Sequence, residues 1–322
     1  MSLSEFDLIT RFFNRGPVRR TGVELGIGDD AAVVNVPPGQ SLVMSMDTLV
    51  AGVHFSVDTP AKEIGHKALA VNLSDIAAMG ATPNWMLLGL TMPQANEAWL
   101  TDFSCGLTQL ADEHNVALIG GDTTHGPLSI TIQINGLVPH GQALQRSGAQ
   151  HGDLIFVTGQ LGDAGLALKL EMQQLIMKLS PQRRDYFIHR LHRPTPRLAA
   201  GQCLRGLASS AIDVSDGLLA DLGHILTASG VGAVIHLEQL PVAPEVKSLS
   251  ETWWDLPLCA GDDYELCFTV SADKKDLVVQ ALQAINCPCR CIGRIEPTRG
   301  LKVLHHGKEI DTSHLKGYLH FE

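Results

Sequence analysis

Short apolar runs alternate with longer segments of helical periodicity along almost the whole chain, and this alternation limits the fold more than any other feature. In the first half we expect strands at residues 41–46, 86–91, 116–119 and 129–134, and helices at 64–78 and 96–113. The strand at 129–134 alternates between apolar and polar residues, which indicates a sheet with one polar face. The first half is therefore expected to be a mixed α/β unit.

The second half resumes this alternation after a stretch without periodicity. Residues 139–153 are rich in Gly and polar side chains, which is typical of a domain boundary. Beyond it we expect strands at 154–158, 211–214 and 233–237, helices at 162–178, 196–208 and from Leu218 onward, and a further strand and helix between 264 and 285. Because 322 residues exceed what one hydrophobic core usually organises, two domains are expected, 1–148 and 149–322.

The charge balance argues against polyanionic partners. The formal net charge is −10, and no basic run is longer than a pair such as Arg19-Arg20 or Arg183-Arg184. Binding to nucleic acid or to an anionic membrane surface requires clustered Lys and Arg, so neither partner is expected. Asp outnumbers Glu by 21 to 13, and many Asp residues lie beside Gly, Ser or Thr. Short carboxylates in turns are typical ligands of hard cations.

Targeting and cysteine patterns indicate a cytoplasmic protein. Residues 1–15 lack an apolar run followed by a small-residue cleavage site, so no signal peptide is expected. No stretch reaches the roughly 18 consecutive apolar residues of a spanning helix. The seven cysteines are odd in number and scattered, which fits a reducing compartment better than a disulfide framework.

A glycine-rich turn, GIGDDAAVV at residues 26–34, admits two interpretations. It formally matches the dinucleotide-binding pattern G-x-G-x-x-A, with Asp47 at a suitable distance to bind a ribose, so an NAD-dependent oxidoreductase is one alternative. That pattern requires a helix after the third small residue. Residues 31–36 are instead rich in β-branched side chains and are followed by Pro37-Pro38, which favours an extended segment.

Two adjacent carboxylates, Asp29 and Asp30, also argue against direct phosphate binding by this turn. A carboxylate about 4 Å from a phosphate oxygen is repelled by roughly 1 to 4 kcal/mol, depending on the local dielectric. The repulsion is removed if Mg²⁺ lies between them, because Mg²⁺ takes carboxylate and phosphate oxygens together. We therefore expect Asp30 to be a metal ligand and Asp29 to cap the turn locally.

Further carboxylates follow apolar strands or lie on a helix in both halves of the chain: Asp47, Asp75, Asp122, Asp213 and Asp216. Taken singly, Asp47, Asp122 and Asp213 are more simply explained as helix caps or turn residues. Asp75 is harder to explain in this way, because it lies beside Ile76 on an alanine-rich helix, where an unpaired carboxylate is costly. Together the five positions favour a cluster of cations that neutralises a nucleoside triphosphate.

Seven motifs, in order between residues 26 and 266, resemble those of the thiamine-monophosphate kinases, and the resemblance extends over about residues 5–321. They are GIGDDAAV (26–33), S-x-D-T-L-V-x-G-x-H-F (45–55), KALAVNLSDIAAMG (67–80), LIGGDTT (118–124), RSGA (146–149), SAIDVSDGL (210–218) and DDYEL (262–266). That family belongs to the ATP-binding superfamily of aminoimidazole-ribonucleotide synthetase. Seven motifs in one order are far more specific than any one of them.

The resemblance implies a two-domain α/β fold of the aminoimidazole-ribonucleotide-synthetase type. The implied N-terminal domain binds ATP and Mg²⁺ and pairs its mixed sheet with that of a second copy, so that a homodimer contains a barrel. A C-terminal α/β domain follows. The implied reaction is direct, in-line transfer of the γ-phosphoryl group of ATP to thiamine monophosphate, giving thiamine diphosphate and ADP. No catalytic residue is expected beyond the metal ligands, because such a transfer depends mainly on positioning and charge neutralisation.

The resemblance also implies roles by motif position. Implied ligands of several Mg²⁺ ions are Asp30, Ser45, Asp47, Asp75, Asp122, Asp213 and Asp216. Implied ATP contacts are Gly121, Asp122, Arg146 and Ser215, and implied contacts to thiamine monophosphate are His54, Asp262 and Tyr318. Two positions depart from the family pattern. Met46 stands where Thr is common, so only its backbone carbonyl can be a ligand, and Asp262 stands where a longer Glu is common.

Other interpretations fit the sequence less well. Selenophosphate synthetase typically requires a reactive Cys or selenocysteine near the N-terminus, and the hydrogenase-maturation dehydratase a C-terminal Cys. Here the first cysteine is Cys105 and the chain ends in GYLHFE. A binding module without enzymatic activity would not explain acidic residues in both halves. The cysteines at 287, 289 and 291 are spaced for one face of a strand rather than for zinc, and no Walker loop occurs.

Overall fold

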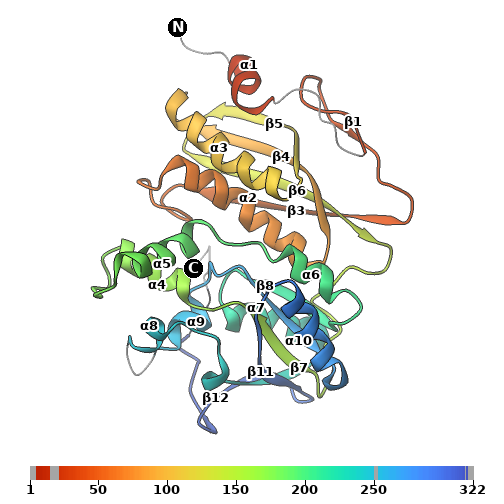
Figure 1. The fold of residues 1–322 in the computed structure, drawn as a ribbon, viewed down its shortest axis with the longest axis vertical. Coiled ribbons are helices and arrows are strands. Elements are labelled where there is room, and N and C mark those ends of the chain that lie inside the picture. Colours follow the sequence, from red (N-terminus) through yellow and green to blue (C-terminus); the bar gives the residue numbers. More distant parts are fainter. Residues whose placement is uncertain (1–4, 15–21, 250–252, 316, 318–322) are drawn as a thin grey trace. The chain divides into compact units, whose positions relative to one another are not determined.

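The computed structural model describes residues 5–14, 22–249, 253–315 and 317 (Figure 1). The chain forms two compact units. The first unit comprises Met1–Ile76 and Ala81–Gly141, and the second comprises Ala77–Gly80 and Gln142–Glu322. Each unit has its own sheet.

The sheet of the first unit has four strands in the order β3-β6-β4-β5. The strands are β3 (Gln40–Val50), β4 (Thr82–Met92), β5 (Ala117–His125) and β6 (Ser129–Pro139). β4 and β5 are parallel, whereas β6 pairs antiparallel with β3 and with β4. The sheet is therefore mixed, as the sequence predicts.

Two helices, α2 (Ala61–Ala78) and α3 (Glu97–Glu113), lie across one face of this sheet (Figure 1). They pack closely because glycines stand where they meet. A Cβ added at Gly65 would lie 2.1 Å from the Phe103 carbonyl oxygen, and one at Gly106 would lie 1.9 Å from that of Lys62. Both helices were expected, and α2 begins three residues before the predicted start at 64.

All four strands of this sheet are longer than predicted, and in β3 and β5 the extension places two carboxylates within the strands. The expected end of the strand at Asp47 is wrong, because β3 continues to Val50 in unbroken antiparallel register with β6. The expected end at residue 119 is also wrong, because β5 runs through Asp122 to His125 alongside β4. In both cases hydrogen bonds to a neighbouring strand satisfy the backbone N–H and C=O groups beyond the predicted end. Asp47 and Asp122 therefore lie within strands.

Short elements precede the sheet. They are α1 (Glu5–Leu8), the π-helical turn η1 (Ile9–Phe13), β1 (Val23–Leu25) and β2 (Val33–Val34). β1 and β2 pair antiparallel and bracket the glycine-rich turn. Residues 31–36 are not helical, which confirms the extended conformation expected from their β-branched side chains.

The second unit contains seven strands in the order β13-β12-β9-β11-β7-β10-β8. These are β7 (Leu154–Thr158), β8 (Ser210–Val214), β9 (Gly232–His236), β10 (Glu265–Val270), β11 (Cys289–Glu296), β12 (Gly300–His305) and β13 (Lys308–Glu309). Only the pair β9 and β12 is parallel among these neighbours. β10 lies between β7 and β8, so the start of β10 and the end of β8 are adjacent.

The helical segments of the second unit are α4 (Asp163–Glu171), α5 (Pro181–His192), α6 (Leu198–Leu204), α7 (Leu218–Ser229), η2 (Leu237–Gln239), α8 (Pro244–Lys247), α9 (Asp255–Cys259), η3 (Ala272–Lys274) and α10 (Lys275–Ala284). The predicted helix at 162–178 is too long, because Gln173 adopts φ +56° directly after α4. The predicted helix at 196–208 is also too long. Helix α5 was not predicted.

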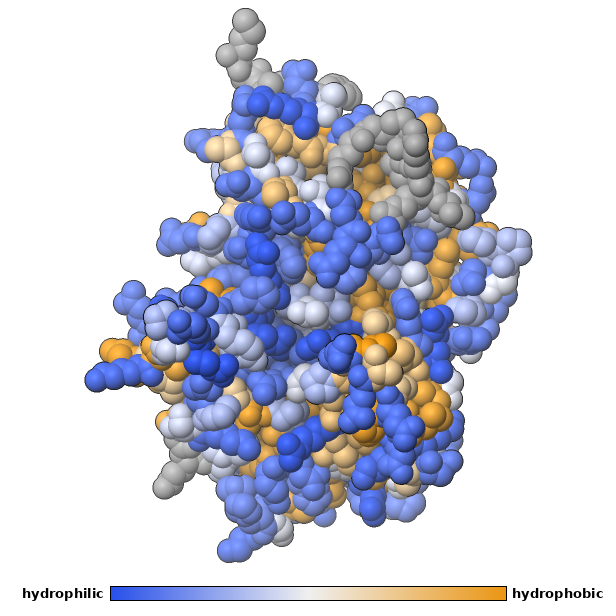
Figure 2. All heavy atoms as spheres, viewed as in Figure 1, coloured by the Kyte–Doolittle hydropathy of each residue, from blue (hydrophilic) through white to orange (hydrophobic). Residues whose placement is uncertain are grey.

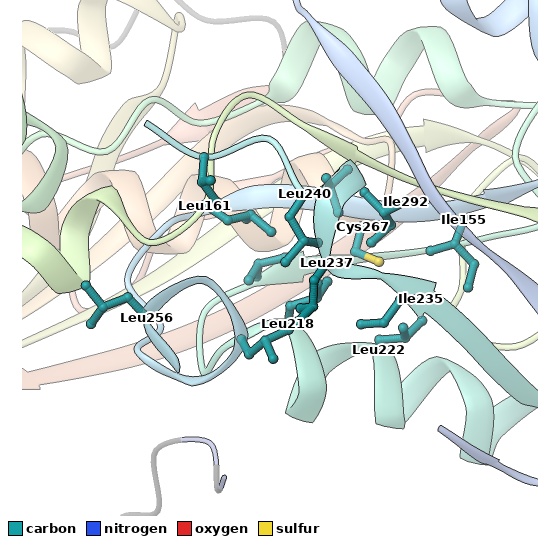
Figure 3. Packing of buried hydrophobic residues seen from close by; sticks show 14 of the residues in the cluster. Ile155, Leu161, Leu218, Leu222, Ile235, Leu237, Leu240, Leu256, Cys267 and Ile292 are labelled. Carbon is teal, nitrogen blue, oxygen red and sulfur yellow. The ribbon is translucent and has the colours of Figure 1, made fainter. Parts of the chain in front are cut away.

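The core of the second unit forms between the sheet and the helices beside it. Figure 3 shows Leu218 and Leu222 of α7 together with Ile155 of β7, Ile235 of β9 and Ile292 of β11. Each of these side chains is fully buried. Burial of one such side chain contributes roughly 1.5–3 kcal/mol. This packing fixes the N-terminus of α7, which follows directly after the end of β8.

The surface view shows a mainly hydrophilic face with apolar atoms in separate areas (Figure 2). Among the exposed apolar side chains are three that alternate along β3: Leu42, Met44 and Met46, which are 37%, 61% and 63% exposed. They lie on one face of the pleat, since successive side chains alternate between faces. In the described residues, no helix combines the length and the apolar character needed to cross a membrane.

Candidate active site

The glycine-rich turn of the first unit lies between β1 and β2 and carries two exposed carboxylates, Asp29 and Asp30. The backbone N–H of Asp30 donates to Asp29 Oδ1 at 2.8 Å, so Asp29 caps its own turn as expected. Gly28 adopts φ +122°, and a Cβ there would meet nothing within 4 Å. Glycine is therefore needed at this position for the backbone conformation and not for space.

A cavity of ≈ 930 Å³ opens beside this turn. Its wall also includes residues 118–123 of β5 and, from β3, Leu42 and Met44. Asp30 and Asp122 both line it, so the structure brings two of the expected metal ligands to one cavity. The volume is within the range of small-molecule sites, and the mixture of apolar walls with a few polar groups is typical of them.

Gly121 lies next to Asp122 in β5, where the backbone of β4 comes very close. Its φ is +149°, and a Cβ there would lie 1.9 Å from the Leu88 carbonyl oxygen. The register between β4 and β5 shifts between Met86 and Leu87, which marks a bulge. The strand contact alone therefore requires glycine at 121. The neighbouring Asp122 is exposed and lines the cavity.

Ser45, Asp47 and Asp75 lie between β3 and α2. Ser45 Oγ donates to Asp75 Oδ2 at 2.5 Å, which joins the strand to the helix. Ser45 and Asp47 alternate with Met44 and therefore face the other side of the pleat. None of the three is among the residues that line the cavity. The structure thus places the expected ligands of the first unit in two groups, one on each face of β3.

Asn72 helps to hold this second group and was not identified from the sequence. Its side chain is buried, its Nδ2 donates to the Ala68 carbonyl at 2.9 Å, and its Oδ1 accepts the backbone N–H of Asp47 at 3.1 Å. The signal in the sequence was the spacing of three between Asn72 and Asp75, which places both on one face of α2. Asn72 therefore ties the middle of β3 to the helix that carries Asp75.

His54 lies in the tight turn after β3. Its Nδ1 accepts the backbone N–H of Val50 at 3.0 Å, and its own backbone N–H donates to the Val50 carbonyl at 3.0 Å. Because Nδ1 is an acceptor here, the proton of the neutral ring is on Nε2. Nε2–H is therefore the donor group of the ring, and a donor is the kind of group that the phosphate contact implied for this residue requires.

Asp213, Ser215 and Asp216 lie at the end of β8 in the second unit. Asp213 is in the strand opposite Leu266 of β10 and is 5% exposed. Ser215 and Asp216 form the turn that leads into α7. The structure therefore brings these three expected site residues together on one short segment.

Asp221, in the first turn of α7, shapes this segment. Its Oδ2 accepts the backbone N–H of Ser215 at 3.0 Å and that of Asp216 at 3.1 Å. The carboxyl group is buried, and burial raises the pKa of Asp221 to about 7. Sequence reasoning missed this residue. An acidic side chain in the first helical turn, five positions after Asp216, was the available signal.

The loop at residues 261–264 lies directly against the same segment. The backbone N–H of Asp262 donates to the Ser215 carbonyl at 2.8 Å, and that of Tyr264 donates to the Val214 carbonyl at 2.8 Å. Asp262 and Tyr264 adopt φ +60° and +49°. A non-glycine residue in this region costs on the order of 1–3 kcal/mol and persists only where its surroundings hold it. Asp262 is thus held beside Ser215.

Arg146 and Tyr318 complete the expected set. Arg146 belongs to the second unit, its side chain is exposed, and its carbonyl accepts Ser229 Oγ at 3.3 Å. Tyr318 lies outside the described residues. The preceding Gly317 is described, and a Cβ there would lie 3.0 Å from the Asp216 carbonyl oxygen. The chain therefore passes next to Asp216 immediately before Tyr318.

Two of the three period-two cysteines, Cys289 and Cys291, lie in β11 as predicted from their spacing, whereas Cys287 precedes the strand. Within the ranges that the structure describes, no three His, Cys, Asp or Glu side chains form a group that could hold a metal ion by themselves. Four of the five expected ligands of the first unit form two pairs, and Asp47 lies on the same face of β3 as Ser45. Asp30 and Asp122 share the cavity, and Ser45 is bonded to Asp75.

The whole chain matches known proteins. Residues 28–138 match the family model of the AIR synthase related protein, N-terminal domain, and residues 150–306 match that of the AIR synthase related protein, C-terminal domain. The thiamine-monophosphate kinase of Escherichia coli (strain K12) is 48% identical over 324 residues, which cover 100% of this chain and 99% of that protein. The chain belongs to the thiamine-monophosphate kinase family.

Solved structures of thiamine-monophosphate kinases have the same fold. The crystal structure of the enzyme from Stenotrophomonas maltophilia K279a is 47% identical, with a TM-score of 0.86 and coverage of 94% of this chain and 97% of that chain. The structure of AaThiL complexed with AMPPCP and TMP is 29% identical, with a TM-score of 0.77 and coverage of 89% of each chain. These matches confirm the two-domain mixed α/β fold and the thiamine-monophosphate kinase resemblance, and they remove the NAD-dependent oxidoreductase as an alternative.

Proposed function

We propose that this chain transfers the γ-phosphoryl group of ATP to thiamine monophosphate in a direct, Mg²⁺-dependent, in-line reaction that yields thiamine diphosphate and ADP. The observation that carries the proposal is the pair Asp30 and Asp122, which line one cavity beside the glycine-rich turn. Two carboxylates at a phosphate site repel the nucleotide unless cations intervene. Membership of the thiamine-monophosphate kinase family supports the choice of substrates.

The donor chemistry fits Mg²⁺, which prefers hard oxygen ligands and shares them with phosphates. The residues proposed to hold several ions are Asp30, Ser45, Asp47, Asp75, Asp122, Asp213 and Asp216. All of them supply carboxylate or hydroxyl oxygens. Met46 has no side-chain oxygen and could contribute only its backbone carbonyl. When bound, the ions neutralise charge on the phosphates. The Ser45–Asp75 hydrogen bond and the Asp221 turn keep these oxygens in place.

The other proposed site residues orient the two substrates. Gly121, Asp122, Arg146 and Ser215 are the proposed ATP contacts, and His54, Asp262 and Tyr318 are the proposed contacts to thiamine monophosphate. The guanidinium of Arg146 suits a phosphate because its donors form a planar fork. The acceptor is itself a phosphate that is ionised at neutral pH, so its oxygen needs no strong base. The residues of the chain therefore contribute by alignment and charge.

We also propose that two copies of the chain form a homodimer. Residues 1–148 are the proposed ATP-binding, Mg²⁺-binding and dimerisation domain, and 149–322 the C-terminal α/β domain. The first compact unit ends earlier, at Gly141, so Arg146 lies in the second unit although it precedes the proposed boundary. The two four-stranded sheets would pair into a barrel through the face opposite α2 and α3. The exposed Met44 and Met46 on β3 support this pairing, because neighbouring apolar side chains on an open sheet face are commonly covered by a partner.

The test is an assay of the purified protein with ATP, Mg²⁺ and thiamine monophosphate, and with free thiamine in a parallel tube. Chromatography then resolves the thiamine esters. We expect thiamine diphosphate from the monophosphate alone and none after chelation of Mg²⁺. Product that persists in excess chelator would contradict the metal requirement. Nucleotide binding without any product would contradict the proposed acceptor.

A further inference from the structure

A buried charged network in the second unit lies outside the residues assigned above. It contains Asp163, Arg190, Asp263 and Glu265, which are 0%, 9%, 1% and 0% exposed, together with Arg197. Buried ion pairs are costly, and replacing them with apolar side chains is often neutral or stabilising. Stability alone therefore does not explain why five ionisable side chains gather here.

Arg190 of α5 is the centre of this network. Its Nη2 donates to the Gln160 carbonyl at 3.2 Å, to the Asp263 carbonyl at 3.3 Å and to Glu265 Oε1 at 3.0 Å. Its Nε lies 3.7 Å from Asp163 Oδ2. One side chain therefore joins the segment after β7, the N-terminus of α4, the loop before β10 and the start of β10.

Glu265 gives Arg190 a fixed partner. Arg197 donates to both carboxylate oxygens of Glu265, from Nε and Nη2, at 2.6 Å each. Thr158 Oγ1 donates to Oε2 at 2.7 Å. A Cβ added at Gly159 would lie 2.1 Å from Oε1, so the backbone of that residue also confines the carboxylate. The position of Glu265 is thus set by three neighbours besides Arg190.

Asp263 connects this network to the loop at 261–264. Its Oδ2 accepts the backbone N–H of Gly162 at 2.7 Å, and its carbonyl accepts from Arg190. The residues on either side of it, Asp262 and Tyr264, both adopt positive φ. The network therefore holds the loop from one side, while the bonds to Ser215 and Val214 hold it from the other.

We propose that Arg190 is a positioning residue for the acceptor substrate: by holding the Asp263 carbonyl, it keeps Asp262 in place beside Ser215. The inference rests on the proposed function, in which Asp262 contacts thiamine monophosphate. Arg190 is expected to affect the binding of thiamine monophosphate and not the binding of ATP. Ser215 and Asp216 have their own anchor in Asp221, so the segment proposed to bind ATP keeps its shape when the loop loosens.

The test compares Arg190→Lys with Arg183→Lys. A lysine keeps the charge but cannot serve several acceptors with one planar fork. Arg183 lies on the same helix and makes a two-pronged pair with Glu245, at 2.6 and 2.7 Å, so it is a matched control. Calorimetry would give the Kd of each protein for thiamine monophosphate and, separately, for ATP with Mg²⁺.

We expect Arg190→Lys to raise the Kd for thiamine monophosphate about tenfold, because small displacements of a binding group are costly. We expect the Kd for ATP to stay within about twofold, and Arg183→Lys to leave both constants within about twofold. An Arg190→Lys protein that folds and binds thiamine monophosphate like the wild type would overturn the proposal. Equal weakening of both ligands would also overturn it, because the network would then be only structural.

A second variant covers the case in which Arg190→Lys does not fold. Asp263→Ala removes the oxygen that accepts the Gly162 N–H, so the loop loses its contact with the N-terminus of α4. It should show the same selective weakening of thiamine monophosphate binding, and unchanged binding would count against the proposal. The kinase assay of the wild-type protein distinguishes a failure of the proposed function from a failure of the role proposed for Arg190. Failure of the wild type to form thiamine diphosphate refutes the proposed function, whereas a wild type that turns over and variants that bind normally refute only the role of Arg190.

Discussion

Asp29 and Asp30 are adjacent in the sequence, but their carboxylates have different tasks. Asp29 accepts the backbone N–H of Asp30 and so stabilises the turn, whereas Asp30 is the proposed metal ligand. We expect Asp30→Asn to lower kcat about 100-fold or more, as the loss of one charge-stabilising group commonly does. Asp29→Asn should stay within a few-fold, since the amide oxygen can still accept the same bond. Equal losses of kcat in the two variants, measured in steady-state assays at saturating Mg²⁺, would contradict this division of roles between Asp29 and Asp30.

Asp221 makes the stability of the metal-free protein depend on pH. Its pKa is raised from 3.8 to about 7 in the folded state. Between these values the folded protein retains a proton that the unfolded chain releases, so the free energy of unfolding decreases as the pH rises. The stabilisation is fully present below about pH 4 and is lost as the pH passes 7. One pKa unit corresponds to about 1.4 kcal/mol, so the loss is on the order of a few kcal/mol.

Asp221→Asn should remove this dependence. The asparagine cannot ionise, and its side-chain oxygen can accept the N–H groups of Ser215 and Asp216. We therefore expect the unfolding free energy of the variant, relative to wild type, to increase as the pH rises from 4 to 7. Urea denaturation in the presence of a chelator measures the difference. A difference that is constant over this range would show that Asp221 titrates normally.

Residues with a local signal could be predicted from the sequence, and residues with distant partners could not. Asp30, Asp75 and Asp122 stand out because each is a carboxylate in a motif. Arg190 and Glu265 are 75 positions apart, so nothing near either of them indicates that they are bonded. The role of Asp221 depends on two backbone N–H groups that converge only when the turn has formed.

At the scale of the element, β5 tolerates no side chain at one of two neighbouring glycines. A Cβ at Gly121 would lie 1.9 Å from the Leu88 carbonyl oxygen, whereas one at Gly120 would meet only the end of the Leu87 side chain at 3.0 Å. We expect Gly121→Ala to lower the free energy of unfolding by about 2–4 kcal/mol, from overpacking and backbone strain together.

Gly120→Ala is the matched control and should cost less than about 1 kcal/mol, because a flexible side chain can move aside. Urea unfolding of both variants measures the two values. Similar losses of unfolding free energy in the two variants would mean that β4 and β5 separate easily at the bulge. The contact with β4 would then not require glycine at 121.

Most of the elements could be predicted from periodicity, but their ends could not. The strand through Asp47 was found, yet its continuation to Val50 depends on β6, which lies far along the chain. The end of α4 depends on the left-handed backbone of Gln173, which glutamine does not signal. Helix α5 was missed because its sequence, PQRRDYFIHRLH, mixes charged and apolar residues, and its buried Arg190 breaks the apolar stripe.

At the scale of the molecule, the proposed homodimer makes its own prediction. Met46 is 63% exposed in one chain and lies on the sheet face proposed to meet the partner. Met46→Lys would place a charge in that interface, where it is costly without a counterion. We expect sedimentation equilibrium to show a dimer for the wild type and mainly monomer for the variant. A lysine at Asp58, an exposed turn residue, is the control and should leave the dimer intact.

The backbone bonds from Asp262 and Tyr264 to Ser215 and Val214 also bear on how new specificity could be built into this scaffold. The two segments come from different parts of the gene, but they are fastened to each other at the ends of adjacent strands β10 and β8. A loop from another protein grafted at 261–264 alone would have to pack against residues 214–216, whose conformation fits the original loop. Redesign of the acceptor preference must therefore exchange 214–216 and 261–264 together, as one cassette.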